Sequence, residues 1–273
     1  MGIFSNKTGR PKIGLALGSG GSHGLAHIGV IKTLIAHDIP IDYIAGSSAG
    51  ALVGGLYAAH QDIEAVERVA LTSDIGRIIR FMTDVSVRGG LLSGYAIERF
   101  IRHELDSITF DQLRIPLVAV ATDIHTGEAI LLREGDVTAA IRASMSVPLV
   151  FEPVSRDSRL LVDGGLAMPV PVAAVRAMGA DIVVGVNLET RVSQAQRDAS
   201  PTITTIAAMT MDILRSNFST MQAYNADLVV SPHFDGKVLV GWNEFLHAQD
   251  FIERGQVSME KAMPHLQQLL SKE

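Results

Sequence analysis

The chain has 273 residues, with 23 Lys and Arg against 29 Asp and Glu and a formal net charge of −6 at pH 7. Hydrophobic residues make up 47% of the chain and charged residues 19%, which excludes a disordered protein, and the acidic balance argues against a nucleic-acid partner. Cysteine is absent, which excludes disulfides, a thiolate nucleophile and a cysteine-based metal site.

Neither an export signal nor a membrane span is visible in the sequence. Residues 1–11 contain no apolar run of secretory-signal length, and no stretch reaches the roughly 18 apolar residues that a spanning helix needs. We therefore expect a cytoplasmic protein in which residues 1–11 are a flexible N-terminus.

The first 60 residues alternate between short apolar runs and helical patterns. Lys12–Leu17 predicts a strand that enters the glycine-rich loop Gly18–Gly24, and Leu25–Ile35 places its apolar residues on one helical face. A second strand, Asp42–Ala45, enters Gly46–Gly50 and then a helix of small residues. This alternation is typical of a parallel sheet covered by helices.

The same alternation continues along the rest of the chain. We predict strands over residues 117–122, 129–132, 160–162, 181–187 and 228–231, the first two forming a hairpin. We predict helices over residues 62–71, 95–105, 137–144, 172–178, 202–224 and 251–270. Because strands occur on both sides of the polar loop Val192–Pro201, we expect one three-layer α/β/α domain over residues 1–273 with a mainly parallel central sheet.

Gly46-Ser47-Ser48-Ala49-Gly50 fits the pattern G-x-S-x-G, with Ser48 at its centre. Between a strand and a helix, these glycines permit a sharp, strained turn that exposes the serine hydroxyl at the helix N-terminus. A helix N-terminus also favours negative charge that develops beside it. The alternative is a glycine-rich turn with a capping serine, but the flanking strand and helix favour Ser48 as a nucleophile.

The loop Gly18-Ser19-Gly20-Gly21-Ser22-His23-Gly24 also lies between a strand and a helix. No Lys-Ser or Lys-Thr pair follows it, which excludes a P-loop. A dinucleotide fingerprint would have glycine where His23 stands, although Asp38 or Asp42 would serve as its acidic ribose partner. An oxyanion hole is a third interpretation, because glycines let several backbone N–H groups converge on one oxygen. A tight turn without a ligand is the fourth.

Two glycine-rich turns that follow successive parallel strands lie side by side at one edge of the sheet, which favours a shared active site. A third motif, Leu161-Val162-Asp163-Gly164-Gly165, ends a predicted buried strand. Asp163 in this place can lie close to a nucleophile, whereas taken alone it is better read as a turn or capping aspartate.

In their order and spacing, the glycine loop, G-x-S-x-G and D-G-G together resemble the patatin-like phospholipases. The likeness covers most of the chain, including Arg142–Pro148 and Gly165–Pro171. The chain is most similar to compact bacterial members related to the catalytic domain of neuropathy target esterase. The chain departs from the family pattern at Ser19 and His23, where the family loop has a glycine and a basic residue. It also has Met168 where many relatives have Asn.

The resemblance implies a serine esterase or phospholipase that hydrolyses lipid acyl esters through a Ser–Asp dyad. It implies Ser48 as the nucleophile, Asp163 as its base, and the backbone amides of Gly20, Gly21 and His23 as the oxyanion hole. Water that Asp163 activates would then hydrolyse an acyl-Ser48 intermediate. No metal or organic cofactor is required, and the expected partner is a lipid or small ester.

Two other functions stay open on the sequence. One is a Ser–His–Asp triad of the α/β-hydrolase kind, since His233, His247 and His265 all follow Asp163 in the chain. The other is a nucleotide- or phosphate-binding α/β protein that uses the Gly18–Gly24 loop. His23 itself is either a simple loop residue, which we favour, or a donor toward a substrate phosphate.

Residues 76–92 mix apolar and arginine side chains and predict a mobile lid that contacts lipid. Such a lid would hold the protein at the inner face of the membrane; an ordinary amphipathic helix packed on the core is the alternative. In the helix 202–224, Met209, Met211 and Met221 would line an acyl pocket or belong to the core.

Overall fold

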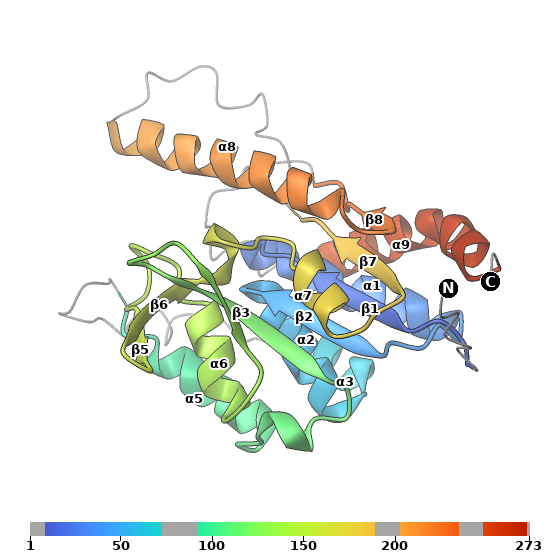
Figure 1. Ribbon diagram of the computed structural model, residues 1–273, viewed down its shortest axis with the longest axis horizontal. Helices are drawn as coiled ribbons and strands as arrows, with labels where there is room; N and C mark the ends of the chain where they lie inside the picture. Colours follow the sequence, from blue (N-terminus) through green and yellow to red (C-terminus); the bar gives the residue numbers. More distant parts are fainter. Residues whose placement is uncertain (1–8, 73–91, 189–202, 235–247, 272–273) are drawn as a thin grey trace, which may run out of the picture.

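The computed structural model describes residues 9–72, 92–188, 203–234 and 248–271 (Figure 1). Within these residues, eight strands form one mixed sheet that has helices on both faces. The three-layer α/β fold that the sequence predicts is therefore confirmed.

All the predicted strands are present in the predicted chain order, and the structure adds one more, β5. They are β1 (Ile13–Leu17), β2 (Tyr43–Ser47), β3 (Leu117–Asp123), β4 (Ala129–Leu132), β5 (Val154–Arg156), β6 (Arg159–Asp163), β7 (Ile182–Val186) and β8 (Leu228–Val230). The pairs β1–β2, β1–β7, β2–β3 and β7–β8 are parallel, whereas β3–β4, β3–β6 and β5–β6 are antiparallel. The sheet is thus mainly parallel, and the predicted hairpin is β3–β4.

Most helices also begin and end close to their predicted residues. They are α1 (Ala26–Ala36), α2 (Ala49–His60), α3 (Ile63–Leu71), α5 (Tyr95–Leu105), α6 (Val137–Ser144), α7 (Val172–Ala177), α8 (Ile203–Ala223) and α9 (Ala248–Leu270). Asp62 and Asp136 cap α3 and α6, because their side chains accept from the amides of Ala65 and Ala139. Short 3₁₀ turns precede α1 and follow β6, at Gly21–Leu25 and Gly164–Leu166.

Side chains on the two faces of the sheet belong to different clusters. Leu15, Leu17 and Val184 belong to the larger cluster, which α1, α2 and α9 complete. Ala16 and Val183, which alternate with them, belong to a second cluster completed by α7 and the end of α8. Because both faces are covered, β1 and β7 read in the sequence as continuous apolar runs.

The structure corrects two predictions and leaves two others outside the described residues. Phe251–Leu270 is part of a single helix, α9, which contains Pro264 and begins three residues earlier. Strand β5 was missed, because three half-exposed residues give no readable periodicity. Apart from Leu92, which bridges to Phe151, the predicted lid 76–92 lies outside the described residues, as does the polar loop 192–201.

Of the helices in the described ranges, none combines the length and the apolar character needed to cross a bilayer.

Candidate active site

The two predicted glycine-rich turns lie side by side, because β1 and β2 are parallel neighbours with Leu17 opposite Gly46. The turn after β2 approaches the end of β1 so closely that a Cβ atom at Gly50 would lie 2.1 Å from the Leu17 carbonyl oxygen. Only glycine fits there. The first turn of α2 therefore rests directly against the glycine loop, as expected from the sequence.

Ser48 occupies the sharp turn between β2 and α2. Its φ of 54° and ψ of −120° lie where glycine is favoured over other residues, so the serine backbone is strained. Its amide donates to the Ser144 hydroxyl at 2.9 Å, which holds the turn against α6. This is the strand–turn–helix geometry that the G-x-S-x-G pattern predicts, with Ser48 at the positive end of α2.

Strand pairing brings Asp163 to Ser48. Along β3, Val120 pairs with both β2 and β4, and Ala121 pairs with both β4 and β6. Strands β2 and β6 consequently share one edge of β3, opposite β4. The last residue of β2, Ser47, faces Val120, and the last residue of β6, Asp163, faces Ala121. The ends of two strands that run toward each other therefore meet, and the next residue after β2 is Ser48.

The side chains of Ser48 and Asp163 are joined at this meeting point. The Ser48 hydroxyl donates to Asp163 Oδ2 at 2.6 Å, and the Gly165 amide donates to Asp163 Oδ1 at 2.8 Å. The Thr122 hydroxyl donates to the Asp163 carbonyl oxygen at 2.8 Å and fixes the backbone. Both Ser48 and Asp163 are buried, so the carboxylate has little contact with water.

Burial raises the pKa of Asp163 above that of an ordinary aspartate, because the charged carboxylate is desolvated. The hydrogen bonds from Ser48 and Gly165, and the charge of Arg215, lower the pKa again but do not cancel this effect. A carboxylate of raised pKa accepts a proton from a neighbouring hydroxyl more readily than a solvated one does.

The glycine loop is held from several directions. The Gly18 and Ser19 amides donate to the carbonyl oxygens of Val186 and Pro169, at 3.1 and 2.8 Å. In the part of the chain that the structure describes, the amides of Gly20 and Gly21 donate to no acceptor. These two N–H groups are thus available to a ligand oxygen.

His23 differs from its predicted role. Its amide, expected as a third donor, donates to the Gly20 carbonyl oxygen at 3.1 Å, because a 3₁₀ turn begins at Gly21. Its ring is buried and stacks on Phe234, with 4.0 Å between ring centroids and 1° between planes. Desolvation, with smaller contributions from Arg215 and Arg254, lowers the pKa of His23 to about 4, so the ring is neutral at pH 7. A packed, neutral imidazole lacks the positive charge that would attract a phosphate, which favours the simpler prediction of a loop residue.

For the predicted triad alternative, the Ser48 hydroxyl donates to a carboxylate and not to a histidine. The side chains of His233 and His265 are exposed. His247 lies outside the described residues. No histidine among the described residues therefore makes the hydrogen bond to Ser48 that a triad needs.

Helix α8 contributes residues to this region that the sequence analysis did not identify. Gln222 donates to the Ala167 carbonyl oxygen and accepts from the Val170 amide, both at 3.3 Å, and so ties α8 to the segment after Asp163. Arg215 lies close enough for its charge to act on Asp163. These residues follow Asp163 by more than 50 positions with no motif around them, so no sequence signal marks them.

The predicted methionine lining of an acyl pocket is not supported for Met221, whose side chain is exposed. Met209 is half-buried, and the side chain of Met211 is outside what the structure describes.

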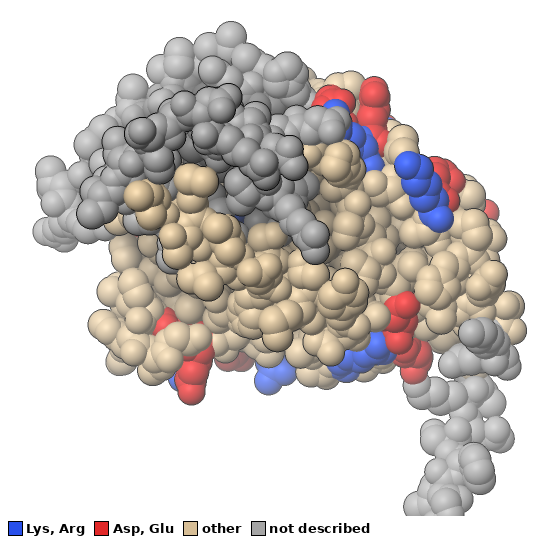
Figure 2. Space-filling model, turned by 90° about the horizontal axis from the view of Figure 1, so that it is seen from above, with Lys and Arg blue, Asp and Glu red and all other residues tan. Residues whose placement is uncertain are grey.

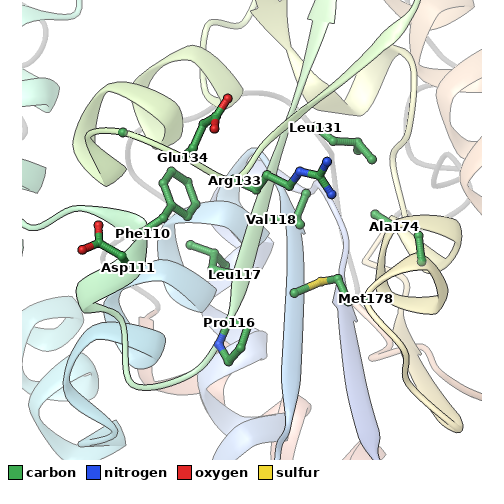
Figure 3. Close-up of a pocket in the computed structure, with 12 residues that line it drawn as sticks. Phe110, Asp111, Pro116, Leu117, Val118, Leu131, Arg133, Glu134, Ala174 and Met178 are labelled. Carbon is green, nitrogen blue, oxygen red and sulfur yellow. The ribbon is translucent and has the colours of Figure 1, made fainter.

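A cavity of about 380 Å³ lies elsewhere on the sheet (Figure 3). Pro116, Leu117 and Val118 at the beginning of β3, together with Met178 after α7, form its apolar part, and Arg133 and Glu134 its polar part. This cavity is at the opposite end of β3 from Ala121, which pairs with Asp163. Among the residues with described positions, no group of three His, Cys, Asp or Glu side chains is arranged to hold a metal ion.

Comparison with known protein families gives a match that covers the residues of the candidate site. The family described as "Patatin-like phospholipase" matches residues 15–176. This range contains the glycine loop, Ser48 and Asp163.

Individual relatives carry related names. An "Uncharacterized NTE family protein" of Mycobacterium tuberculosis is 39% identical over 194 residues, which is 71% of this chain and 54% of the relative. "Lysophospholipase nte1" of Emericella nidulans is 31% identical over 179 residues, which is 64% of this chain and 12% of the relative. The chain thus spans about half the length of the mycobacterial relatives and a much smaller part of the fungal ones.

Two solved structures share the fold at low sequence identity. VipD from Legionella pneumophila matches with a TM-score of 0.53 and 11% identity, over 94% of this chain and 67% of VipD. The type III effector protein ExoU matches with a TM-score of 0.52 and 15% identity, over 95% of this chain and 53% of ExoU.

Proposed function

Because this chain belongs to the patatin-like phospholipase family, we propose that it is a serine esterase that hydrolyses lipid acyl esters. Ser48 is the nucleophile and Asp163 is its general base, without a histidine between them. The observation that carries this proposal is the buried 2.6 Å hydrogen bond from the Ser48 hydroxyl to Asp163 Oδ2. The two amides of the neighbouring glycine loop that donate to no acceptor among the described residues support it.

The first half of the reaction forms an acyl enzyme. Ser48 Oγ attacks the ester carbonyl carbon while its proton moves to Asp163 Oδ2, 2.6 Å away. The carbonyl oxygen becomes an oxyanion that the Gly20 and Gly21 amides stabilise, helped by the positive end of α2. When the tetrahedral intermediate collapses, the proton on Asp163 passes to the departing alcohol, and the acyl group stays on Ser48.

The second half repeats these steps with water. Asp163, again ionised, takes a proton from a water molecule that attacks the acyl-Ser48 carbonyl, and then returns it to Ser48 Oγ as the carboxylic acid leaves. Since the loop amides face the same carbonyl oxygen in both halves, one hole serves both. None of these steps uses a metal ion or an organic cofactor.

Lipid acyl esters are the proposed substrate class. The family description names phospholipases, and the fungal relatives carry the name lysophospholipase. The site of this chain supports the same class of chemistry, because an alcohol nucleophile, a carboxylate base and paired amides suit acyl transfer to water.

Labelling with a fluorophosphonate probe tests this proposal directly. We expect the probe to form a covalent adduct on the Ser48 peptide, detected by mass spectrometry, since only an activated serine reacts readily. Labelling should be slowed by a phospholipid or p-nitrophenyl ester substrate. An unlabelled chain that binds ATP or NAD in calorimetry would instead support the nucleotide-binding alternative.

The pH dependence of hydrolysis should report the pKa of Asp163. The base works only when ionised, so kcat/KM should fall tenfold per pH unit below the pKa of Asp163. Burial raises that pKa above about 3.9, so the fall should begin at a higher pH than for a solvated aspartate. Initial rates on a soluble ester between pH 4 and pH 9, roughly the range spanning aspartate and histidine titration, would measure it. An acidic limb that disappears in His233→Ala would contradict the assignment.

A further inference from the structure

Helix α8 has its apolar side chains on the outside. Large apolar residues are exposed along it and just after its end, and their spacing puts them on one broad helical face, which we name the outer face: Ile206, Ile213, Leu214, Phe218, Met221 and Tyr224. Two exposed polar residues, Thr210 and Asn217, lie among them on this face. In a surface helix of a soluble protein this face would be charged or polar. The outer face of α8 therefore exposes more large apolar side chains to water than a surface helix normally does.

The opposite face of α8 is polar and packs on the protein. Ser219 is buried and donates to the Asn187 side chain at 2.7 Å, and Gln222 is held by the segment that follows Asp163. Ser216 is buried, and Arg215 is half-buried near Asp163. Since these contacts fix the rotation of the helix, the apolar outer face cannot turn inward without breaking them.

Charged residues are scarce around this surface. Figure 2 views the molecule from above Figure 1, the side on which α8 lies. In this view the coloured Lys, Arg, Asp and Glu side chains gather at the edges of the described surface, and its middle carries few. Figure 2 thus shows a surface that is poor in charge, and the exposed large side chains on α8 make part of it apolar. Such a surface suits a partner that offers apolar contacts and not charge.

The position of α8 indicates which partner that is. Gln222 contacts the backbone of Ala167, four residues after Asp163, and Leu166 beside it is also exposed. The outer face is thus carried by a helix attached to the rim of the candidate active site. A lipid surface that contains the substrate would contact the outer face and the rim of the active site at the same time.

We propose that the outer face of α8 docks on an uncharged lipid surface and so holds the active site against its substrate. This inference rests on the proposed lipid esterase function. Apolar burial supplies the affinity, with Tyr224 and Phe218 suited to the boundary between head groups and acyl chains. Because the chain has a net charge of −6, binding should not require anionic lipid or low salt.

Vesicle sedimentation with phosphatidylcholine vesicles tests the proposal. The test variant is Leu214→Glu with Met221→Glu, whose side chains are 60% and 68% exposed on the outer face. The matched control is Val257→Glu on α9, 53% exposed. We expect the double variant to lose vesicle partitioning by about tenfold or more, as loss of buried apolar area predicts, with Val257→Glu close to wild type.

Hydrolysis of a soluble p-nitrophenyl ester, measured on the same samples, separates the two proposals. We expect all three proteins to hydrolyse it at similar rates, which also shows that the variants are folded. Three outcomes would each overturn the docking surface. The double variant could bind vesicles as well as the wild type, or binding could require anionic lipid and disappear in 0.5 M salt. Light scattering could also show a wild-type dimer that the double variant disrupts. If the wild type does not hydrolyse the soluble ester, the proposed function is contradicted. The vesicle-binding result would still test the docking surface.

Discussion

Replacement of Asp163 by asparagine is expected to lower kcat for ester hydrolysis by about 10³- to 10⁴-fold in a chain that still folds. The amide keeps the shape of the carboxylate, and its oxygen can still accept from Gly165, but it cannot take the proton of Ser48. The expected loss corresponds to about 4–5.5 kcal/mol of transition-state stabilisation. Steady-state rates on a p-nitrophenyl ester would measure it.

Histidine variants are the controls for this result. His233→Ala and His247→Ala should keep activity within about twofold, because the Ser48 hydroxyl already donates to a carboxylate. Full activity in Asp163→Asn, together with loss in either histidine variant, would move the assignment to a triad.

The same Asp163→Asn change should not destabilise the fold at neutral pH. Burial raises the folded-state pKa of Asp163, so ionisation of this group opposes folding. Its effect on wild-type stability appears as pH rises from the unfolded value of about 3.9 through the raised folded value, where the free energy of unfolding decreases. The neutral amide has no such slope, and urea titrations of both proteins across this pH range would show the difference.

Replacement of Ser48 is expected to abolish turnover, with a kcat loss of about 10⁴-fold or more. Two variants separate its chemistry from its backbone strain. Ser48→Ala keeps the Cβ at a φ of 54°, whereas Ser48→Gly removes it. Strain at such a position costs about 1–3 kcal/mol and glycine loses about 0.5–1 kcal/mol in chain entropy, so the glycine variant should be the more stable inactive protein by about 1 kcal/mol.

Chemical denaturation and fluorophosphonate labelling on the same samples would check both parts of this prediction. Ser155→Ala, an exposed serine on β5, is the control and should retain labelling and stability. Residual turnover in Ser48→Gly near the wild-type rate would contradict the nucleophile assignment.

The elements around the candidate site were predictable because their signals are local. Continuous apolar runs mark β1, β2 and β7, which are covered on both faces, and glycines mark the turns that follow β1 and β2. Because β1 and β2 are consecutive parallel strands, the turns that follow them are expected to be adjacent. Gly50 shows the physical reason for the motif, since no larger residue fits against the Leu17 carbonyl.

What the sequence did not predict depends on contacts between distant segments. That β2 and β6 share one edge of β3 follows from register, which no local pattern encodes. The His23 amide donates to the Gly20 carbonyl oxygen and closes a turn that begins at Gly21. The number and spacing of glycines do not predict which loop amide is used in this way. For the methionines of α8 the sequence offered an acyl pocket or the core, but the Met221 side chain is exposed. Apolar spacing alone does not say which face of a helix is inward.

The aromatic stack on His23 has a consequence for truncation. Phe234 and Phe251, which enclose that ring, come from the last 40 residues of the chain, as does helix α9, which packs along α1. The family match ends at residue 176, and Val186, which anchors the Gly18 amide, also lies beyond it. A fragment cut at that boundary would retain every residue of the three motifs and still lose the supports that keep the loop amides in place. The segment that matches the family is therefore shorter than the segment that holds the glycine loop in place.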